Sequence, residues 1–199
     1  MMVLWREKLA FLAVPKTGTT AIEAVLEPHA AIAYRRPPMV KHMTLQRFNR
    51  FMRPYLSAAG LGDVQTMAVM REPVDWLGSW YRYRQRQSIK NSRKSTAGLS
   101  FDAFVAAYLS DHDRPEFAEV GSQARFLSGG ASHPTVDHLF RYDDLAAVQV
   151  FLQAKLGADV AFAKVNISPK TELTLSAELL AAYRKKHAAD FDLYASLSR

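Results

Sequence analysis

Three segments rich in apolar residues lie far apart along the chain: Leu9 to Val14, Val64 to Met70 and Val136 to Tyr142. The first is an unbroken apolar run, which is typical of a strand covered on both faces in a parallel sheet. Each segment is followed by a polar turn and then by residues with helical spacing. We therefore predict three core strands.

Between these strands, apolar residues recur at the spacing of helices. One predicted helix is N-capped by Thr44 and places four apolar residues on one face: Leu45, Phe48, Met52 and Tyr55. The other predicted helices cover residues 21–26, 73–83, 101–108 after a capping Ser100, 145–156 before a terminating Gly157, and about 176–188. The polar, basic segment 87–99 is expected to be a mobile loop. Strands that alternate with helices indicate an α/β fold with a central, mainly parallel sheet, and because no linker divides the chain we expect residues 1–199 to form a single domain.

The composition narrows the function. The 199 residues include no cysteine, which excludes disulfides, thiolate metal sites and cysteine nucleophiles and fits a cytoplasmic location. The formal net charge of +7 favours an anionic ligand, such as a nucleotide, a nucleic acid, an acidic polysaccharide or a membrane surface. The apolar run at Leu9 to Val14 is too short to cross a bilayer, which needs about 20 residues, so we expect no membrane span.

The turn after the first predicted strand has the residues of a phosphate-binding loop, Pro15-Lys16-Thr17-Gly18-Thr19-Thr20. The backbone N–H groups of the following helix would face a phosphate, and Gly18 would let the ligand approach closely. Lys16 would add a charge, and the three threonine hydroxyls would donate hydrogen bonds. Because Lys16 precedes the glycine, this is not a Walker A loop, and a nucleoside triphosphatase is disfavoured. The alternative is an ordinary strand-to-helix turn with a capping threonine.

A second candidate anion site follows the second predicted strand. Arg71 comes directly after this strand, and Ser79 lies about two turns into the next helix, so both side chains could reach one anion. A guanidinium offers a planar fork that suits a phosphate. The alternative is a surface arginine and a small serine in a helix contact.

These segments resemble the PAPS (3′-phosphoadenosine-5′-phosphosulfate)-dependent sulfotransferases. Phe11 to Thr20 is similar to the family's 5′-phosphosulfate loop, and Met70 to Ser79 is similar to its 3′-phosphate motif, although Glu72 stands where an asparagine is common. Leu139 to Leu145 is similar to the family's late R-Y-E-D-L segment, and Asn166 to Lys170 also resembles the family. The resemblance implies a P-loop-NTPase-like sulfotransferase fold, PAPS as the donor and 3′,5′-adenosine bisphosphate as the product.

The resemblance also implies roles for individual residues. Lys16 would contact the 5′-phosphate and the sulfate being transferred, with Thr17, Gly18, Thr19 and Thr20 completing the loop. Arg71 and Ser79 would hold the 3′-phosphate, and Lys170 would add a donor-phosphate contact. No clustered histidine or carboxylate ligands stand out in the sequence, so we expect no metal.

Transfer to a hydroxyl also needs a base with a pKa near 7. Of the six histidines, His42 lies just before the helix capped by Thr44, between the two phosphate motifs, where related sulfotransferases often place a catalytic residue. The alternative is that His42 is a surface or capping histidine without a catalytic role. Glu72 is the rival base, and the sequence does not decide between them.

The acceptor cannot be identified from the sequence; a small molecule or a glycan is expected, with no nucleic acid as partner. Basic residues that could face an anionic glycan are Arg35, Arg36, Arg82, Arg84, Arg86, Lys90, Arg93 and Lys94, and the alternative is that they are solvated charges. Two other functions remain open: a small-molecule kinase of related nucleotide-binding fold, and a basic nucleic-acid-binding protein that uses residues 82–94.

Overall fold

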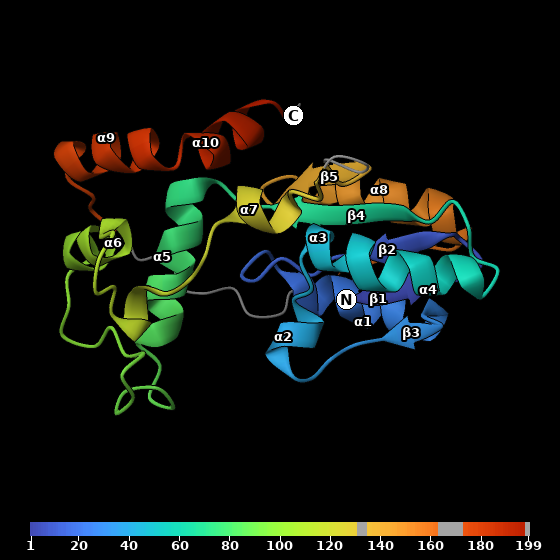
Figure 1. Ribbon diagram of the computed structural model, residues 1–199, viewed down its shortest axis with the longest axis horizontal. Coiled ribbons are helices and arrows are strands. Elements are labelled where there is room, and N and C mark those ends of the chain that lie inside the picture. Colours follow the sequence, from blue (N-terminus) through green and yellow to red (C-terminus); the bar gives the residue numbers. More distant parts are fainter. Residues whose placement is uncertain (131–134, 163–172, 198–199) are drawn as a thin grey trace. The chain divides into compact units, whose positions relative to one another are not determined.

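Figure 1 shows a computed structural model that describes residues 1–130, 135–162 and 173–197. The chain forms two compact units, which we describe separately. The first comprises residues 1–71, 123–165 and 197–199, and the second comprises residues 72–122 and 166–196. The prediction that the whole chain is a single domain stays a prediction.

Within the described residues, the first unit contains a five-stranded mixed sheet in the order β3-β1-β2-β4-β5. The strands are β1 (Met2–Leu4), β2 (Leu9–Phe11), β3 (Ile32–Ala33), β4 (Gln65–Met70) and β5 (His138–Arg141). Strand β4 pairs in parallel with β2 and with β5, whereas β1 pairs antiparallel with β2 and β3. The α/β class is therefore confirmed, and parallel pairing holds for the three predicted strands. Strands β1 and β3 make the sheet mixed. They were not predicted from the sequence, because strands this short show no recognisable alternation of apolar and polar residues.

The predicted apolar run lies at the centre of the first unit, and every side chain from Leu9 to Val14 is fully buried. Alternate residues of β2 and its extension share one face of the sheet with Met67 and Val69 of β4. That face packs against α1 (Thr19–Leu26) and α8 (Leu145–Leu156). The bonding between β2 and β4 continues at Leu12, whose N–H donates to the Met67 carbonyl at 2.8 Å. The chain thus leaves β2 in a fixed direction before the turn at Pro15.

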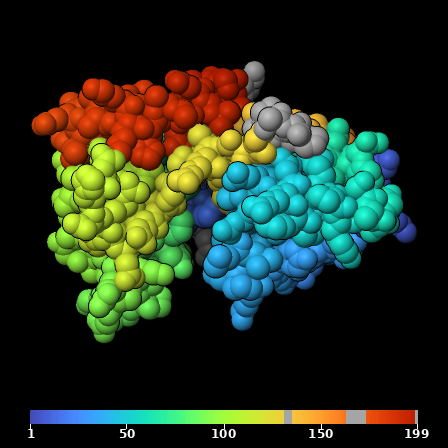
Figure 2. Space-filling model, viewed as in Figure 1, coloured from blue at the N-terminus to red at the C-terminus, as the bar shows by residue number. Residues whose placement is uncertain are grey.

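The other helices of the first unit are short: α2 (Pro38–Lys41), α3 (Leu45–Arg47), α4 (Arg53–Ala58) and α7 (Gln123–Leu127). The space-filling view shows the cyan residues of α3 to α4 covering one face of this unit (Figure 2). Thr44 caps α3 as predicted, because its Oγ1 accepts a hydrogen bond from the Arg47 N–H at 3.3 Å. Tyr55 was wrongly placed on the buried face and is 62% exposed. A π-helical turn over Phe48–Met52 widens the helix and shifts its register, so Leu56 is buried instead.

The second unit is helical in its described part, with α5 (Pro73–Arg84), α6 (Phe101–Leu109), α9 (Ala177–Lys186) and α10 (Ala188–Ala195). Aromatic side chains form its core: Trp76, Tyr81, Phe101, Phe104, Tyr108 and Tyr183. Ser100 caps α6 as predicted by accepting a hydrogen bond from the Ala103 N–H. The predicted last helix corresponds to α9, and α10, which was not predicted from the sequence, follows after His187. No helix in the described ranges combines the length and the apolar character needed to cross a membrane.

The basic segment 87–99 forms turns, as expected of a loop. One of its anchors is Thr96, which is fully buried and whose hydroxyl donates to the Tyr81 carbonyl at 2.8 Å. Its mobility stays a prediction.

Candidate functional site

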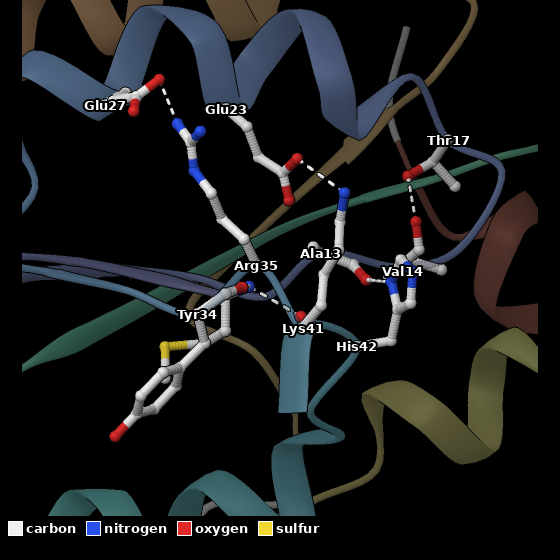
Figure 3. A network of polar contacts seen from close by, with 10 residues as sticks. Ala13, Val14, Thr17, Glu23, Glu27, Tyr34, Arg35, Lys41 and His42 are labelled. Atoms are coloured by element: carbon white, nitrogen blue, oxygen red, sulfur yellow. Dashed lines mark hydrogen bonds and ion pairs between the residues drawn. The ribbon is translucent and has the colours of Figure 1, made fainter. Parts of the chain in front are cut away.

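The loop between β2 and α1 is held closed by its own hydrogen bond. Thr17 is fully buried, and its Oγ1 donates to the Val14 carbonyl at 2.9 Å (Figure 3). Lys16 and Gly18 both have left-handed backbone angles, with φ of 69° and 72°. The Thr17 side chain thus shapes the loop, and its predicted hydrogen bond to a phosphate stays a prediction.

The amino end of α1 opens onto this loop. Gly18 is the N-cap residue, no side chain caps the helix, and no acidic residue lies in its first turn. Gly18 and Thr20 are exposed to solvent, whereas Thr19 is buried. Unsatisfied N–H groups and the helix dipole make such an end favourable for an anion.

Tyr142 covers one side of the loop. A Cβ atom at position 18 would lie 2.9 Å from Cε2 of Tyr142, so Gly18 is required both for its backbone angle and for this close approach. Tyr142 follows β5 directly, and its N–H donates to the Met70 carbonyl at 2.8 Å, which continues the pairing with β4. The sequence placed Tyr142 in a family-like segment but gave no sign that its ring contacts the loop.

Arg71 joins the loop from the end of β4. Its Nη1 donates to the Lys16 carbonyl at 3.3 Å, and its guanidinium carbon lies 4.4 Å from the centre of the Tyr142 ring. The side-chain amide of Gln123 binds both backbone groups of Arg71: Oε1 accepts from the Arg71 N–H at 2.9 Å, and Nε2 donates to the Arg71 carbonyl at 2.7 Å. The structure therefore brings Arg71, one residue of the second predicted anion site, into contact with the Lys16 loop. Sequence reasoning missed Gln123.

His42 is fixed to the start of the same loop. It caps the carboxyl end of α2, is half-buried, and its Nδ1 lies 2.7 Å from the Ala13 carbonyl (Figure 3). A carbonyl only accepts hydrogen bonds, so we assign the proton of the neutral ring to Nδ1, which leaves the basic lone pair on Nε2. Burial lowers the pKa of His42, with a smaller lowering from Lys41, while the Ala13 hydrogen bond and Glu23 oppose the change. The imidazole is therefore neutral and able to accept a proton at neutral pH.

Ion pairs fasten the segment before His42 to α1. Lys41 Nζ lies 2.8 Å from the Glu23 carboxylate, and Arg35 pairs with Glu27. Figure 3 shows that Glu23 and Glu27 both lie on the segment that follows the Lys16 loop. Polar contacts with Glu23 of α1, with Glu27 just after α1 and with Ala13 thus help to hold His42 in position.

Two further predicted residues, Ser79 and Glu72, belong to the second unit. Ser79 is 6% exposed on α5 in the second unit. Glu72 also belongs to that unit, where its carboxylate accepts a hydrogen bond from the Asp75 N–H at 2.8 Å and caps α5. Burial raises the pKa of Glu72. Lys170 lies outside the described residues.

Several of the basic residues between 82 and 94 have partners in their own unit. Arg82 lies 3.4 Å from Asp75, and Arg93 lies 3.7 Å from Glu116. Arg84 is buried, and its guanidinium donates to the carbonyls of Glu116 and Glu119. These contacts favour a structural role for Arg84 and reduce the charge available for a nucleic acid.

Among the described residues, no group of three or more histidine, aspartate or glutamate side chains is placed to hold a metal ion. Comparison with known protein families finds no family model that matches the chain, and comparison with curated proteins finds no match.

Proposed function

We propose that this chain is a PAPS-dependent sulfotransferase, which moves a sulfuryl group from PAPS to a hydroxyl or amine acceptor. The observation that supports this most directly is the meeting of the Lys16 loop with Arg71 at the carboxyl ends of two neighbouring parallel strands. In open α/β sheets, ligands bind at the carboxyl ends of the strands. Two cationic residues beside an uncapped helix end suit a donor that carries more than one phosphate.

The donor would bind with its 5′-phosphosulfate at the amino end of α1, where Lys16 and the loop amides offset its charge. Arg71 would take the 3′-phosphate. The contributions of Ser79 and Lys170 come from the resemblance to sulfotransferases and stay predictions. No role is assigned to a metal ion, because the proposed donor loop supplies its own positive charge.

The reaction would join the acceptor oxygen to sulfur while the bond from sulfur to the 5′-phosphate oxygen breaks. The electron pair of that bond would pass to the leaving phosphate, and Lys16 would stabilise the charge that develops there. Nε2 of His42 would take the proton of the acceptor, because Nδ1 already carries one for Ala13. The product nucleotide would be 3′,5′-adenosine bisphosphate.

A thermal-shift comparison of nucleotides tests this proposal. We expect 3′,5′-adenosine bisphosphate to raise the melting temperature and 5′-AMP to raise it much less, because a ligand that binds only the native state stabilises it more the more tightly it binds. A larger shift with ATP and Mg²⁺ would favour a kinase. Equal shifts with the bisphosphate and AMP would remove the case for a 3′-phosphate site. Salt-sensitive binding of DNA or RNA that persists after Lys16→Ala would favour the nucleic-acid alternative.

A further inference from the structure

The side-chain amide of Gln123 binds the N–H and the carbonyl of Arg71, which lies just beyond β4. Gln123 satisfies both groups through one side chain, with hydrogen bonds of 2.9 and 2.7 Å. It is 1% exposed, so these bonds form away from water.

We infer that Gln123 is a positioning residue that sets the direction of Arg71 for recognition of the 3′-phosphate; this inference rests on the proposed function. Two hydrogen bonds fix the peptide groups on both sides of the Arg71 Cα, and therefore the direction in which its side chain leaves the backbone. The guanidinium is then held against the Lys16 carbonyl and the Tyr142 ring. A side chain ordered in advance loses less conformational entropy when a ligand binds.

The two hydrogen bonds between Gln123 and Arg71, which we call the clamp, join two points that are far apart in the sequence. Arg71 is the last residue before the chain leaves the first unit, and Gln123 is the residue at which it returns. We therefore expect loss of the clamp to affect Arg71 more than it affects the Lys16 loop, which is closed by its own Thr17 bond.

Two substitutions of similar shape test the inference. Gln123→Met removes both hydrogen bonds, and Gln123→Glu keeps an acceptor for the Arg71 N–H but loses the donor to its carbonyl. The measurement is calorimetric affinity for 3′,5′-adenosine bisphosphate and for 5′-AMP, reported as their ratio. Gln46→Met, at an exposed glutamine of α3, is the matched control.

We expect Gln123→Met to lower the ratio of bisphosphate affinity to AMP affinity by about 10-fold, because a misdirected Arg71 would lose part of its charge-assisted contact with the 3′-phosphate. The AMP affinity itself should change by less than about twofold. Gln123→Glu should give a smaller loss, and Gln46→Met should leave the ratio unchanged. In the Arg71→Ala background, Gln123→Met should cause no further loss, because Gln123 acts through Arg71.

An unchanged ratio in Gln123→Met would overturn the inference, as would a parallel loss of AMP and bisphosphate affinity, which is the mark of a merely structural role. If Gln123→Met does not fold, an affinity ratio in Gln123→Glu equal to that of the wild type would also overturn the inference. The proposed function fails separately: the wild-type protein would then bind both nucleotides equally or neither of them.

Discussion

Replacing His42 by asparagine separates its proposed catalytic role from its structural one. The Nδ2 atom of asparagine is bonded to Cγ, as Nδ1 of histidine is, so His42→Asn can still donate a hydrogen bond to the Ala13 carbonyl, 2.7 Å from Nδ1 in the structure. It removes Nε2, the nitrogen that would accept the proton. His42→Ala removes both functions and is the comparison variant.

The two variants should differ in stability and agree in activity. His42→Ala loses one hydrogen bond and leaves the Ala13 carbonyl without this donor, which should lower the free energy of unfolding by about 1 kcal/mol. His42→Asn should unfold close to the wild type. Both should lower turnover by about 100-fold or more, the range for a lost general base, and leave bisphosphate affinity intact.

The assay is transfer of labelled sulfate from PAPS to a panel of glycans, phenols and amines, followed by denaturant unfolding of each variant. Near-normal turnover in His42→Asn would refute the base assignment and make Glu72 the next residue to test. Lost nucleotide binding in the same variant would contradict the assignment of His42 to the acceptor.

Burial lowers the pKa of His42 from its ordinary value of 6.5, which gives this residue a pH signature. Because the unfolded chain binds this proton more tightly than the folded protein, the free energy of unfolding should rise with pH between the lowered pKa and about 6.5. His42→Asn should lack this rise. The acidic limb of the wild-type pH–rate profile should lie below about 6.5, and the limb should disappear in His42→Asn.

Arg71→Ala should weaken bisphosphate binding by about 2–3 kcal/mol in calorimetry, the range for a charge-assisted phosphate contact, and unchanged affinity would place the 3′-phosphate elsewhere. Lys16→Ala should lower turnover much more than bisphosphate affinity, because its interaction strengthens as the sulfur–oxygen bond breaks; equal losses would contradict that role. Thr17→Val should lower the free energy of unfolding by about 1 kcal/mol through loss of its bond to Val14, whereas Thr17→Ser should not. Equal stability of the two Thr17 variants would argue against this account of the loop.

The sequence predicted the parts of the fold that carry a strong local signal. The unbroken apolar run at Leu9 to Val14 predicted a buried strand, and Ser100 and Gly157 marked helix ends that the structure confirms. The sequence did not say which strands are neighbours; the parallel pairing of β2 with β4 is what brings the Lys16 loop and Arg71 to the same edge of the sheet.

The features that the sequence did not reveal depend on contacts across the chain. Gln123 lies at the start of a short helix, and nothing in its neighbours indicates that its amide binds Arg71. The sequence shows a threonine at position 17 but not whether its hydroxyl binds a ligand or the Val14 carbonyl. Tyr55 was misplaced because a π-helical turn changes the helical period without a mark in the local composition.

The left-handed backbone at Lys16 creates a trade-off between stability and the proposed activity at this position. A residue with a Cβ atom is destabilised by about 1–2 kcal/mol in this conformation, whereas glycine adopts it freely. Glycine at position 16 would therefore stabilise the loop and remove the charge that the proposed chemistry needs. Directed evolution that selects for heat resistance alone should enrich for this substitution, so a library built on this protein should be screened for heat resistance and for the proposed sulfuryl transfer in the same round.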